Sequence, residues 1–204
     1  MFMALQKNFY QKDTVVVAQA LLGTCLVHDS AQGKTVGRIV ETEAYLFKDD
    51  PACHASRGQT QRNAAMFGPP GHAYIYLIYG MHLCFNVVTA PVGQGEAVLI
   101  RALAPVEGIP LMEKRRGTNE IQKLCNGPGK LMQAMGMRLE QNGCELFDGP
   151  LTIWPRNSHG GSCKIDVVET PRIGITAGAE LPLRFYLKGN RYASRRCRAG
   201  ESGD

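Results

Sequence analysis

Two carboxylates and an aromatic ring recur at alternate positions in the segment GRIVETEAY, residues 37–45. The alternation of a β-strand places Ile39, Glu41, Glu43 and Tyr45 on one face. Neighbouring carboxylates can act as general acids or bases. A strand can equally carry glutamate on a solvated edge, where it pairs with a cation. The segment alone therefore leaves a catalytic and a structural interpretation open.

Tyrosines gather in the apolar run from residue 73 to 89. Tyr74 and Tyr76 would point to the same side of a strand, and core packing is the ordinary explanation for that spacing, above all for Tyr74. Tyr79 stands at a bend next to Gly80, where a ring is harder to bury. An exposed ring can stack on a base or enter between base steps. Tyr79 therefore points to nucleic acid more than the other two tyrosines.

His54 has the neighbour Cys53 and follows Asp50 by four residues, which superficially suggests a metal site. Adjacent side chains seldom chelate one ion, and the chain has no HExxH or CxxC spacing. A hydrogen-bonded loop histidine is the commoner outcome. The sequence also lacks a serine nucleophile elbow, a P-loop and a GxGxxG motif. Acyl transfer, Walker-type nucleotide hydrolysis and dinucleotide redox chemistry therefore lose support.

The elements that must position these residues follow from capping, alternation and turn signals. In chain order we expect a helix between Asp13 and Gly23, strands at 24–28 and 35–45, a binding loop at 47–72, two strands within 73–89 folded back at Tyr79-Gly80, a strand at 97–105 that Pro105 closes, helices at 111–114 and 129–136, and strands at 171–176 and 183–189. The turn Gly127-Pro128-Gly129 opens the last helix and could offer backbone N–H groups to a phosphate. Loops as long as 47–72 are usually functional.

Composition narrows the class of protein. A chain of 204 residues favours one domain, and 44% hydrophobic with 20% charged residues is typical of globular proteins rather than disordered or fibrous ones. The net charge of +5 favours a polyanionic partner without requiring one. Seven scattered cysteines argue against a disulfide framework and fit a reducing compartment. Because no apolar run could span a bilayer and the start turns polar too early for a signal peptide, we expect an intracellular protein without membrane contact.

Several blocks, taken together and in order, resemble the alkyladenine DNA glycosylase family, the 3-methyladenine DNA glycosylases of the mammalian type. These blocks are GRIVETEAY, DPACHASRGQTQRNAAMFGPPGHAYIYLIYGMHLCFNVV, AVLIRALAP, NGPGKLMQAMG and RIGI…LRFY. The match runs from about Phe9 to Ser194, so we expect one glycosylase domain over residues 1–194 and a disordered tail over 195–204. The short flanks suggest a minimal, bacterial-type member.

The resemblance implies an α+β fold: a single mixed domain with a curved antiparallel sheet flanked by helices, related to the C-terminal domain of formyltransferases. It also implies a monofunctional, monomeric enzyme without metal or cofactor. Such an enzyme binds double-stranded DNA, flips out an alkylated purine and hydrolyses its glycosidic bond, leaving an abasic site for base excision repair. The expected substrates are 3-methyladenine and 7-methylguanine, with hypoxanthine and ethenoadenine as further candidates.

The resemblance also assigns roles residue by residue. Glu43 would be the general base that activates water, and Arg101 and the main-chain carbonyl of Ile173 would hold that water in line. The flipped base would lie between Tyr45 and Tyr76, with His54 against its edge and Asn86 against the exocyclic amine of normal guanine. Tyr79 would fill the gap in the duplex. Arg62 and Lys130 would contact the DNA backbone, although a loop-pinning role for Arg62 and a structural role for Lys130 are open alternatives.

These assignments agree with elementary physics. A purine must leave the duplex before its glycosidic bond can be attacked, at a cost of a few kcal/mol. Stacking on aromatic rings offsets roughly 1 to 3 kcal/mol per base, and a cationic base gains further from cation–π contact. The sequence departs from the family at Phe47, Cys53 and Ala104. None of these removes a proposed catalytic group, but they leave the conformation of the loop around His54, and with it base selectivity, open.

Two other functions compete. One is a nucleic-acid-binding module that recognises damaged or structured DNA or RNA without cleaving it, although such a module has no need of a water-activating carboxylate beside a base pocket. The other is a metal-dependent hydrolase that uses His54, Asp50 and cysteines, which requires tight metal binding. The residues favour the glycosylase.

Overall fold

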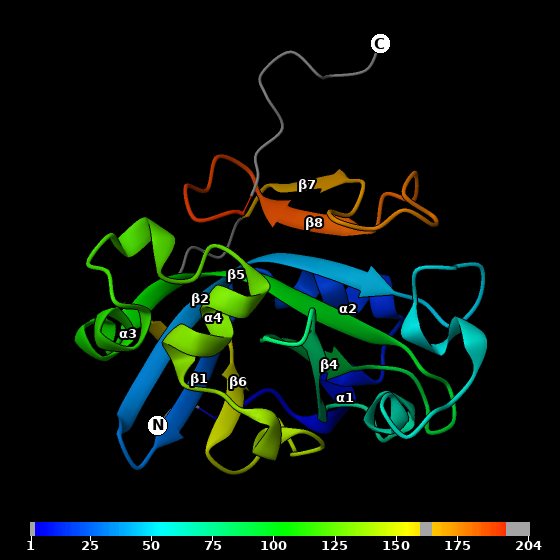
Figure 1. Ribbon diagram of the computed structural model, residues 1–204, viewed down its shortest axis with the longest axis horizontal. Coiled ribbons are helices and arrows are strands. Elements are labelled where there is room, and N and C mark those ends of the chain that lie inside the picture. Colours follow the sequence, from blue (N-terminus) through cyan, green and yellow to red (C-terminus); the bar gives the residue numbers. More distant parts are fainter. Residues whose placement is uncertain (1–2, 160–164, 195–204) are drawn as a thin grey trace.

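The computed structural model describes residues 3–159 and 165–194, and its centre is one antiparallel sheet (Figure 1). The sheet has eight strands in these residues, and six of them follow the order β3-β4-β5-β2-β1-β6, while β8 pairs with both β2 and β7. The strands are β1 (Cys25–Ser30), β2 (Gly33–Tyr45), β3 (Ala73–Ile78), β4 (His82–Val88), β5 (Ala97–Glu107), β6 (Leu151–Trp154), β7 (Val167–Thr170) and β8 (Arg184–Leu187).

Helices pack on this sheet and share its core. They are α1 (Lys7–Tyr10), α2 (Thr14–Leu21), α3 (Ile109–Arg116) and α4 (Pro128–Met135), with 3-10 turns at His54–Arg57, Ala64–Phe67, Ile121–Lys123, Leu139–Gln141 and Arg156–His159. The largest hydrophobic cluster joins apolar side chains of α2 and α4 to those of the central strands. The described residues therefore form a mixed α+β domain, and none of their helices is long and apolar enough to cross a membrane.

The long strand β2 organises the sheet. It pairs with β5 along one edge, and along the other with β1 near its start and with β8 near its end. Figure 1 shows β2 and β5 arching side by side across the molecule. The end of β2 carries the GRIVETEAY segment, so its glutamates face residues from β5, β8 and the segment between β7 and β8.

Most of the expected elements are confirmed. Asp13 caps α2 by accepting hydrogen bonds from the backbone N–H groups of Val15 and Val16. The hairpin of β1 and β2 forms, and β3 and β4 fold back where the sequence places the bend, at Tyr79-Gly80. The helix expected at 129–136 begins one residue earlier, with Pro128 in its first turn, where its missing N–H costs nothing.

Two sequence-based expectations about strands were wrong. Residues 171–176 are a loop, and the strand lies just before them at β7, because Pro171 has no N–H for a ladder and the backbone N–H of Ile173 bonds to a side chain instead. Pro105 does not close β5, which runs two residues further. The structure also contains β6, for which the sequence analysis made no prediction.

The facial alternation in β2 also needs correction. The pairing of β2 with β5 shifts register on both sides of Glu41, so the strict two-residue period is broken there. Ile39 consequently joins the main hydrophobic core together with Ala44, on the opposite face from the glutamates. Glu41 and Glu43 are completely buried, so the alternative of a solvated edge is excluded for both.

Candidate active site

A cavity of about 590 Å³ opens between the β3–β4 hairpin, the start of α4, the loop before β3 and the segment after β7. This volume lies within the range of small-molecule sites, which is about 300 to 1,000 Å³. Its lining contains most of the residues that the sequence assigned to a base pocket: Tyr45, His54, Tyr76, Tyr79, Asn86, Arg101, Lys130 and Ile173. Residues more than 100 positions apart in the sequence therefore meet at one hollow.

Glu43 lies just behind the cavity wall, bonded to three residues that form it. Its Oε2 accepts from the Tyr45 hydroxyl at 2.9 Å and from Arg101 Nη1 at 3.0 Å, and its Oε1 accepts from the backbone N–H of Ile173 at 2.8 Å. A carboxylate has about four acceptor positions. Among the described residues three are filled, so one position on Oε1 is left for a further donor such as water.

The two side chains that donate to Glu43 Oε2, those of Tyr45 and Arg101, both have raised pKa values. Burial, followed by the charge of Glu43, raises the pKa of Tyr45 above its ordinary value, so its hydroxyl stays protonated and remains a donor. Burial alone would lower the pKa of the Arg101 guanidinium, but the carboxylates of Glu43 and Glu41 outweigh that effect and raise it. Both donors to Oε2 therefore hold their protons at any physiological pH.

Glu43 is part of a buried layer of alternating charges, which we call the ionic layer. It consists of three carboxylates and three guanidiniums, all nearly inaccessible to solvent: Glu41, Glu43, Asp50, Arg101, Arg172 and Arg184. Buried charges are tolerated only when they are paired, and here the two signs balance. The layer gives the wall behind the cavity a fixed electrostatic pattern.

Asp50 and Arg172 form the tightest pair of this layer. Arg172 bonds in a bidentate manner, with Nη1 and Nη2 each 2.6 Å from a carboxylate oxygen of Asp50, and Nη1 also donates to the carbonyl of Ala44 at 2.9 Å. The same guanidinium stacks over the Tyr45 ring, 4.6 Å from its centroid. The pair thereby holds both Tyr45 and the backbone of Ile173 next to Glu43.

This pairing also bears on the metal hypothesis. Both oxygens of Asp50 accept hydrogen bonds, from Arg172 and from the backbone N–H groups of Leu46 and Ala52. Burial raises the pKa of the Cys53 thiol to about 11, so the thiolate that binds metals is disfavoured. Within residues 3–159 and 165–194, no three His, Cys, Asp or Glu side chains are grouped to hold a metal ion. The arrangement gives the metal-dependent hydrolase no support.

Aromatic rings form the other wall of the cavity. The rings of Tyr76 and His54 meet edge to face at 4.5 Å, and His54 Nδ1 hydrogen-bonds to the Tyr74 hydroxyl at 2.9 Å. Burial, assisted by the charge of Arg62, lowers the pKa of His54, so the ring is neutral at physiological pH. Tyr74 is buried as expected of a core residue, yet it also lines the cavity and orients His54.

Asn86 is fixed at the same wall. Its Nδ2 donates to the backbone carbonyl of Tyr74 at 3.0 Å, across the pairing of β3 with β4. The hydrogen bond sets the plane of the amide at the cavity surface, where a bound ring would meet it.

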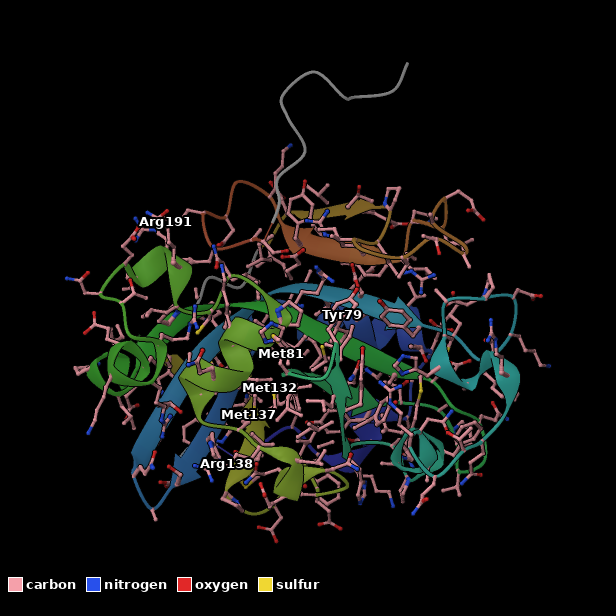
Figure 2. All side chains as sticks on the ribbon, viewed as in Figure 1. Tyr79, Met81, Met132, Met137, Arg138 and Arg191 are labelled. Atoms are coloured by element: carbon pink, nitrogen blue, oxygen red, sulfur yellow. The ribbon has the colours of Figure 1, made fainter. Side chains whose placement is uncertain are left out.

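The hairpin tip at the cavity mouth is exposed and strained. Tyr79 and Met81 are 80% and 73% exposed, and Figure 2 shows both at the tip of the β3–β4 hairpin. Tyr79 also has a φ of 51°, which is unusual for a bulky residue and costs free energy; such strain is often found at functional sites. An exposed aromatic ring in a strained turn beside an aromatic cavity is suited to entering another molecule.

The two basic candidates differ in their attachments. Arg62 Nη2 donates to the carbonyl of Leu77 in the hairpin at 2.6 Å, and its guanidinium lies 6.0 Å from the Tyr76 ring centroid. Lys130 lines the cavity mouth and donates to the side chain of Asn126 at 2.9 Å. The geometry of Arg62 fits the loop-pinning alternative, whereas Lys130 keeps an exposed charge at the mouth.

Sequence reasoning missed several members of the site. Arg172 and Arg184 belong to segments read only as strands, and Asp50 was weighed only as a metal ligand. Arg172 pairs with Asp50 across 122 residues and Arg184 with Glu41 across 143, which no local pattern indicates. Glu41 had a signal, its alternation with Glu43, but the pattern could not distinguish a partner of the site from a solvated side chain.

Comparison with known proteins agrees with this geometry. Residues 8–191 match the family model described as methylpurine-DNA glycosylase (MPG). Curated proteins named "Putative 3-methyladenine DNA glycosylase" are similar along almost the whole chain. The protein from Methanoculleus marisnigri is 55% identical, covering 95% of this chain and 100% of its own. Those from Carboxydothermus hydrogenoformans and Prosthecochloris aestuarii are 49% and 48% identical, covering 95% and 93% of this chain and 100% and 90% of theirs. The chain therefore belongs to the methylpurine-DNA glycosylase family and is a DNA-repair glycosylase, a hydrolase of N-glycosyl bonds.

Proposed function

We propose that this glycosylase removes alkylated purines from double-stranded DNA by direct hydrolysis, with 3-methyladenine and 7-methylguanine as its main substrates. The observation that carries the proposal is Glu43. Its carboxylate is held by three donors, keeps one acceptor position and borders a cavity of base size that is lined by tyrosines. Hypoxanthine and ethenoadenine are further substrates, released more slowly because a neutral leaving group also needs a proton.

In the proposed reaction, water donates one O–H to the remaining position on Glu43 Oε1 and its other O–H to the Ile173 carbonyl, while an Arg101 N–H donates to its oxygen. As the water oxygen bonds to the sugar C1′ atom, its proton passes to Glu43. The bond between C1′ and the purine nitrogen breaks, and its electron pair leaves with the base. An alkylated purine is cationic before this step and leaves neutral, so a carboxylate that also stabilises the oxocarbenium-like sugar suffices.

Recognition of the base rests on the cavity walls. Tyr45 and Tyr76 stack on the two faces of the flipped purine, and the neutral His54 meets its edge. Because its pKa is lowered, His54 adds no positive charge against a cationic base. The fixed amide of Asn86 crowds the exocyclic amine of normal guanine. Stacking on two tyrosine faces favours the cationic, damaged base over a normal one.

Recognition of the duplex rests on the hairpin and the basic rim. Tyr79 enters the base stack and fills the space that the flipped nucleotide leaves. Lys130 contacts a backbone phosphate, whereas Arg62 pins the hairpin through the carbonyl of Leu77. The enzyme acts as a monomer without metal or cofactor. The relation of its fold to the formyltransferase C-terminal domain and the domain limit at residue 194 stay predictions, and the tail at 195–204 lies outside the described residues.

The test compares the wild type with Glu43→Gln on duplex DNA carrying one 3-methyladenine-type or ethenoadenine lesion, with EDTA present. We expect the wild type to release free base and leave alkali-labile sites. Glu43→Gln keeps the shape of the side chain but cannot take a proton, so base release falls by about 10²- to 10⁴-fold while lesion binding persists. Glu140→Gln, the same change at an exposed glutamate, is the matched control.

The outcomes separate the candidate functions. If neither protein releases base from any of several alkylated and deaminated purines while both bind lesions, the reaction proposed here is wrong and the binding module takes its place. Loss of wild-type activity in EDTA that added metal restores would instead favour a metal-dependent hydrolase.

A further inference from the structure

Glu41 has no role in the reaction proposed above, yet its carboxylate accepts three hydrogen bonds behind the cavity. Its Oε1 accepts from Arg184 Nε at 2.6 Å and from the Ser194 hydroxyl at 2.9 Å, and its Oε2 accepts from the backbone N–H of Ser194 at 2.6 Å. The side chain is completely buried. A buried ionised carboxylate is costly, so an arrangement that retains one calls for a reason beyond packing.

Besides Arg184 and Ser194, Glu41 faces Arg101, and this third contact suggests what the carboxylate does. Arg101 Nε is 3.4 Å from Glu41 Oε1, while Arg101 Nη1 is 3.0 Å from Glu43 Oε2. Arg101 Nε is buried and has no hydrogen-bond partner among the described residues, so its attraction to Glu41 is one of charge. The guanidinium is therefore held between two carboxylates that approach it from different directions.

We propose that Glu41 is a positioning residue for the glycosylase reaction: it holds the Nε side of Arg101, so that the guanidinium shares its charge between two carboxylates and stays aligned at the cavity wall. The placement of Arg101 by Glu41 rests on geometry alone. Its effect on base release rests on the proposed function. Glu41 also ties residue 194 to the back of the site, because Ser194 contributes two of the bonds that fix Glu41.

The charges predict what happens without Glu41. Among the described residues, Glu43 would become the only carboxylate paired with Arg101, and the guanidinium would turn toward it and occupy more of its acceptor positions. The position on Oε1 that water needs would then be contested, and the Arg101 N–H groups that face the cavity would be withdrawn. Displacement of a positioning group by about 1 Å costs about 10²-fold in rate in well-studied cases.

A purely structural role is the competing explanation, and strand β2 offers a control for it. Thr42 is the next residue, lies on the opposite face and donates a buried hydrogen bond to the carbonyl of Ala18 in α2 at 2.9 Å. Thr42→Val removes this hydrogen bond without touching Arg101. It should lower the free energy of unfolding, as Glu41→Gln does, while leaving the charges behind the cavity unchanged.

The first measurement follows the Nε–H signal of Arg101 by nitrogen-15 NMR in the wild type, Glu41→Gln and Thr42→Val. We expect a shifted signal and faster hydrogen exchange in Glu41→Gln alone. An unchanged Arg101 signal in Glu41→Gln would overturn the proposal. This measurement needs no enzymatic activity, so it decides the placement of Arg101 even if the glycosylase reaction itself is refuted.

The second measurement is single-turnover base release at saturating enzyme. We expect Glu41→Gln to slow the release step by about 10- to 100-fold while lesion affinity stays within about threefold of the wild type. Thr42→Val should release base at the wild-type rate. If Glu41→Gln and Thr42→Val release base at equal rates, Glu41 has only a structural role and the proposal is overturned.

Ser194→Ala provides a milder perturbation if Glu41→Gln does not fold. It withdraws one hydrogen bond from Glu41 and leaves the carboxylate charge and the backbone bond in place. The expected result is a smaller change of the same kind, namely faster exchange at Arg101 Nε and base release slowed a few-fold. A wild-type Arg101 signal together with wild-type release in this variant would count against the proposal.

Discussion

The ionic layer behind the cavity and the hairpin tip in front of it are built on opposite principles. In the ionic layer every charged side chain is buried and paired, and Glu43 is fixed by three hydrogen bonds. At the hairpin tip, Tyr79 and Met81 are exposed, and the backbone of Tyr79 has a positive φ. The two regions lie on either side of one cavity, which is the proposed base pocket.

The difference reflects when each region does its work. Groups that stabilise charge in a reaction act best when they are placed before the substrate arrives, because no reorganisation is then needed during the reaction. A wedge can be satisfied only by a partner that is absent in the free protein, so it must remain exposed until DNA binds. The layer should therefore determine folding and the rate of the chemical step, and the tip should determine binding.

Asp50→Asn should produce the largest effect on folding, and it tests the first half of this comparison. The neutral amide leaves the buried guanidinium of Arg172 without a counter-charge, so we expect the free energy of unfolding to fall by about 3 to 5 kcal/mol in urea denaturation. Asp49→Asn, the same change at the exposed neighbouring residue, should leave it within about 0.5 kcal/mol of the wild type. Equal stabilities for the two variants would show that this pair contributes little.

Tyr79→Ala should have the reverse profile. The side chain contacts little in the free protein, so the free energy of unfolding should change by less than about 0.5 kcal/mol. Binding to lesion-containing duplex should weaken by about 1 to 3 kcal/mol, because the wedge no longer stacks on bases. Val16→Ala, a truncation at an exposed apolar residue of α2, should bind DNA like the wild type. If Tyr79→Ala binds the lesion as tightly as the wild type does, the hairpin tip does not determine binding and the contrast with the ionic layer is wrong.

The same division explains what the sequence could and could not predict. The hairpin tip is local: a tyrosine next to glycine between two apolar runs indicates an exposed ring in a turn, and Tyr79 is indeed exposed. The capped helix α2 and the hairpins are local in the same sense. Local rules of capping, alternation and turn formation suffice for such elements.

The ionic layer is not local, and there the sequence patterns failed. Alternation in β2 placed Ile39 beside Glu41, but a register shift against β5 separates them, and register depends on the partner strand. Residues 171–176 alternate like a strand, yet their polar groups serve Glu43 and Asp50, which are distant in sequence. The roles of Glu43 and Arg101 came from resemblance to a family, whereas the buried partners of both required the three-dimensional structure.

The proposed base pocket lies between the two regions, and its affinity for a cationic lesion should depend on pH through His54. Its pKa lies below the ordinary value of 6.5, so the fold favours the neutral ring. Stability from this group is therefore present above the ordinary pKa and is lost as the pH falls through the lowered one. The protonated ring would also repel a cationic base, so affinity for a cationic lesion should fall by up to about tenfold per pH unit there.

The groups that face His54 are the hydroxyl of Tyr74, the ring of Tyr76 and the charge of Arg62. Burial raises the pKa of both tyrosines, so His54→Gln should flatten the acidic limb of the affinity profile. A neutral ethenoadenine lesion should show a shallower limb with the wild type. If the fall in affinity at low pH is the same in His54→Gln as in the wild type, a group other than His54 causes it.

The smallest expected effect separates the two basic residues at the rim. If Lys130 contacts a phosphate, Lys130→Gln should lower affinity for damaged and undamaged duplex alike, and should reduce the slope of log affinity against log salt concentration by about one unit. Arg62 is held by the carbonyl of Leu77 and stands near the Tyr76 ring, so Arg62→Gln should act on the hairpin instead. It should weaken lesion binding more than binding to undamaged DNA, with little change in salt slope. If Arg62→Gln instead lowers the salt slope by a full unit, Arg62 contacts a phosphate directly and does not act through the hairpin.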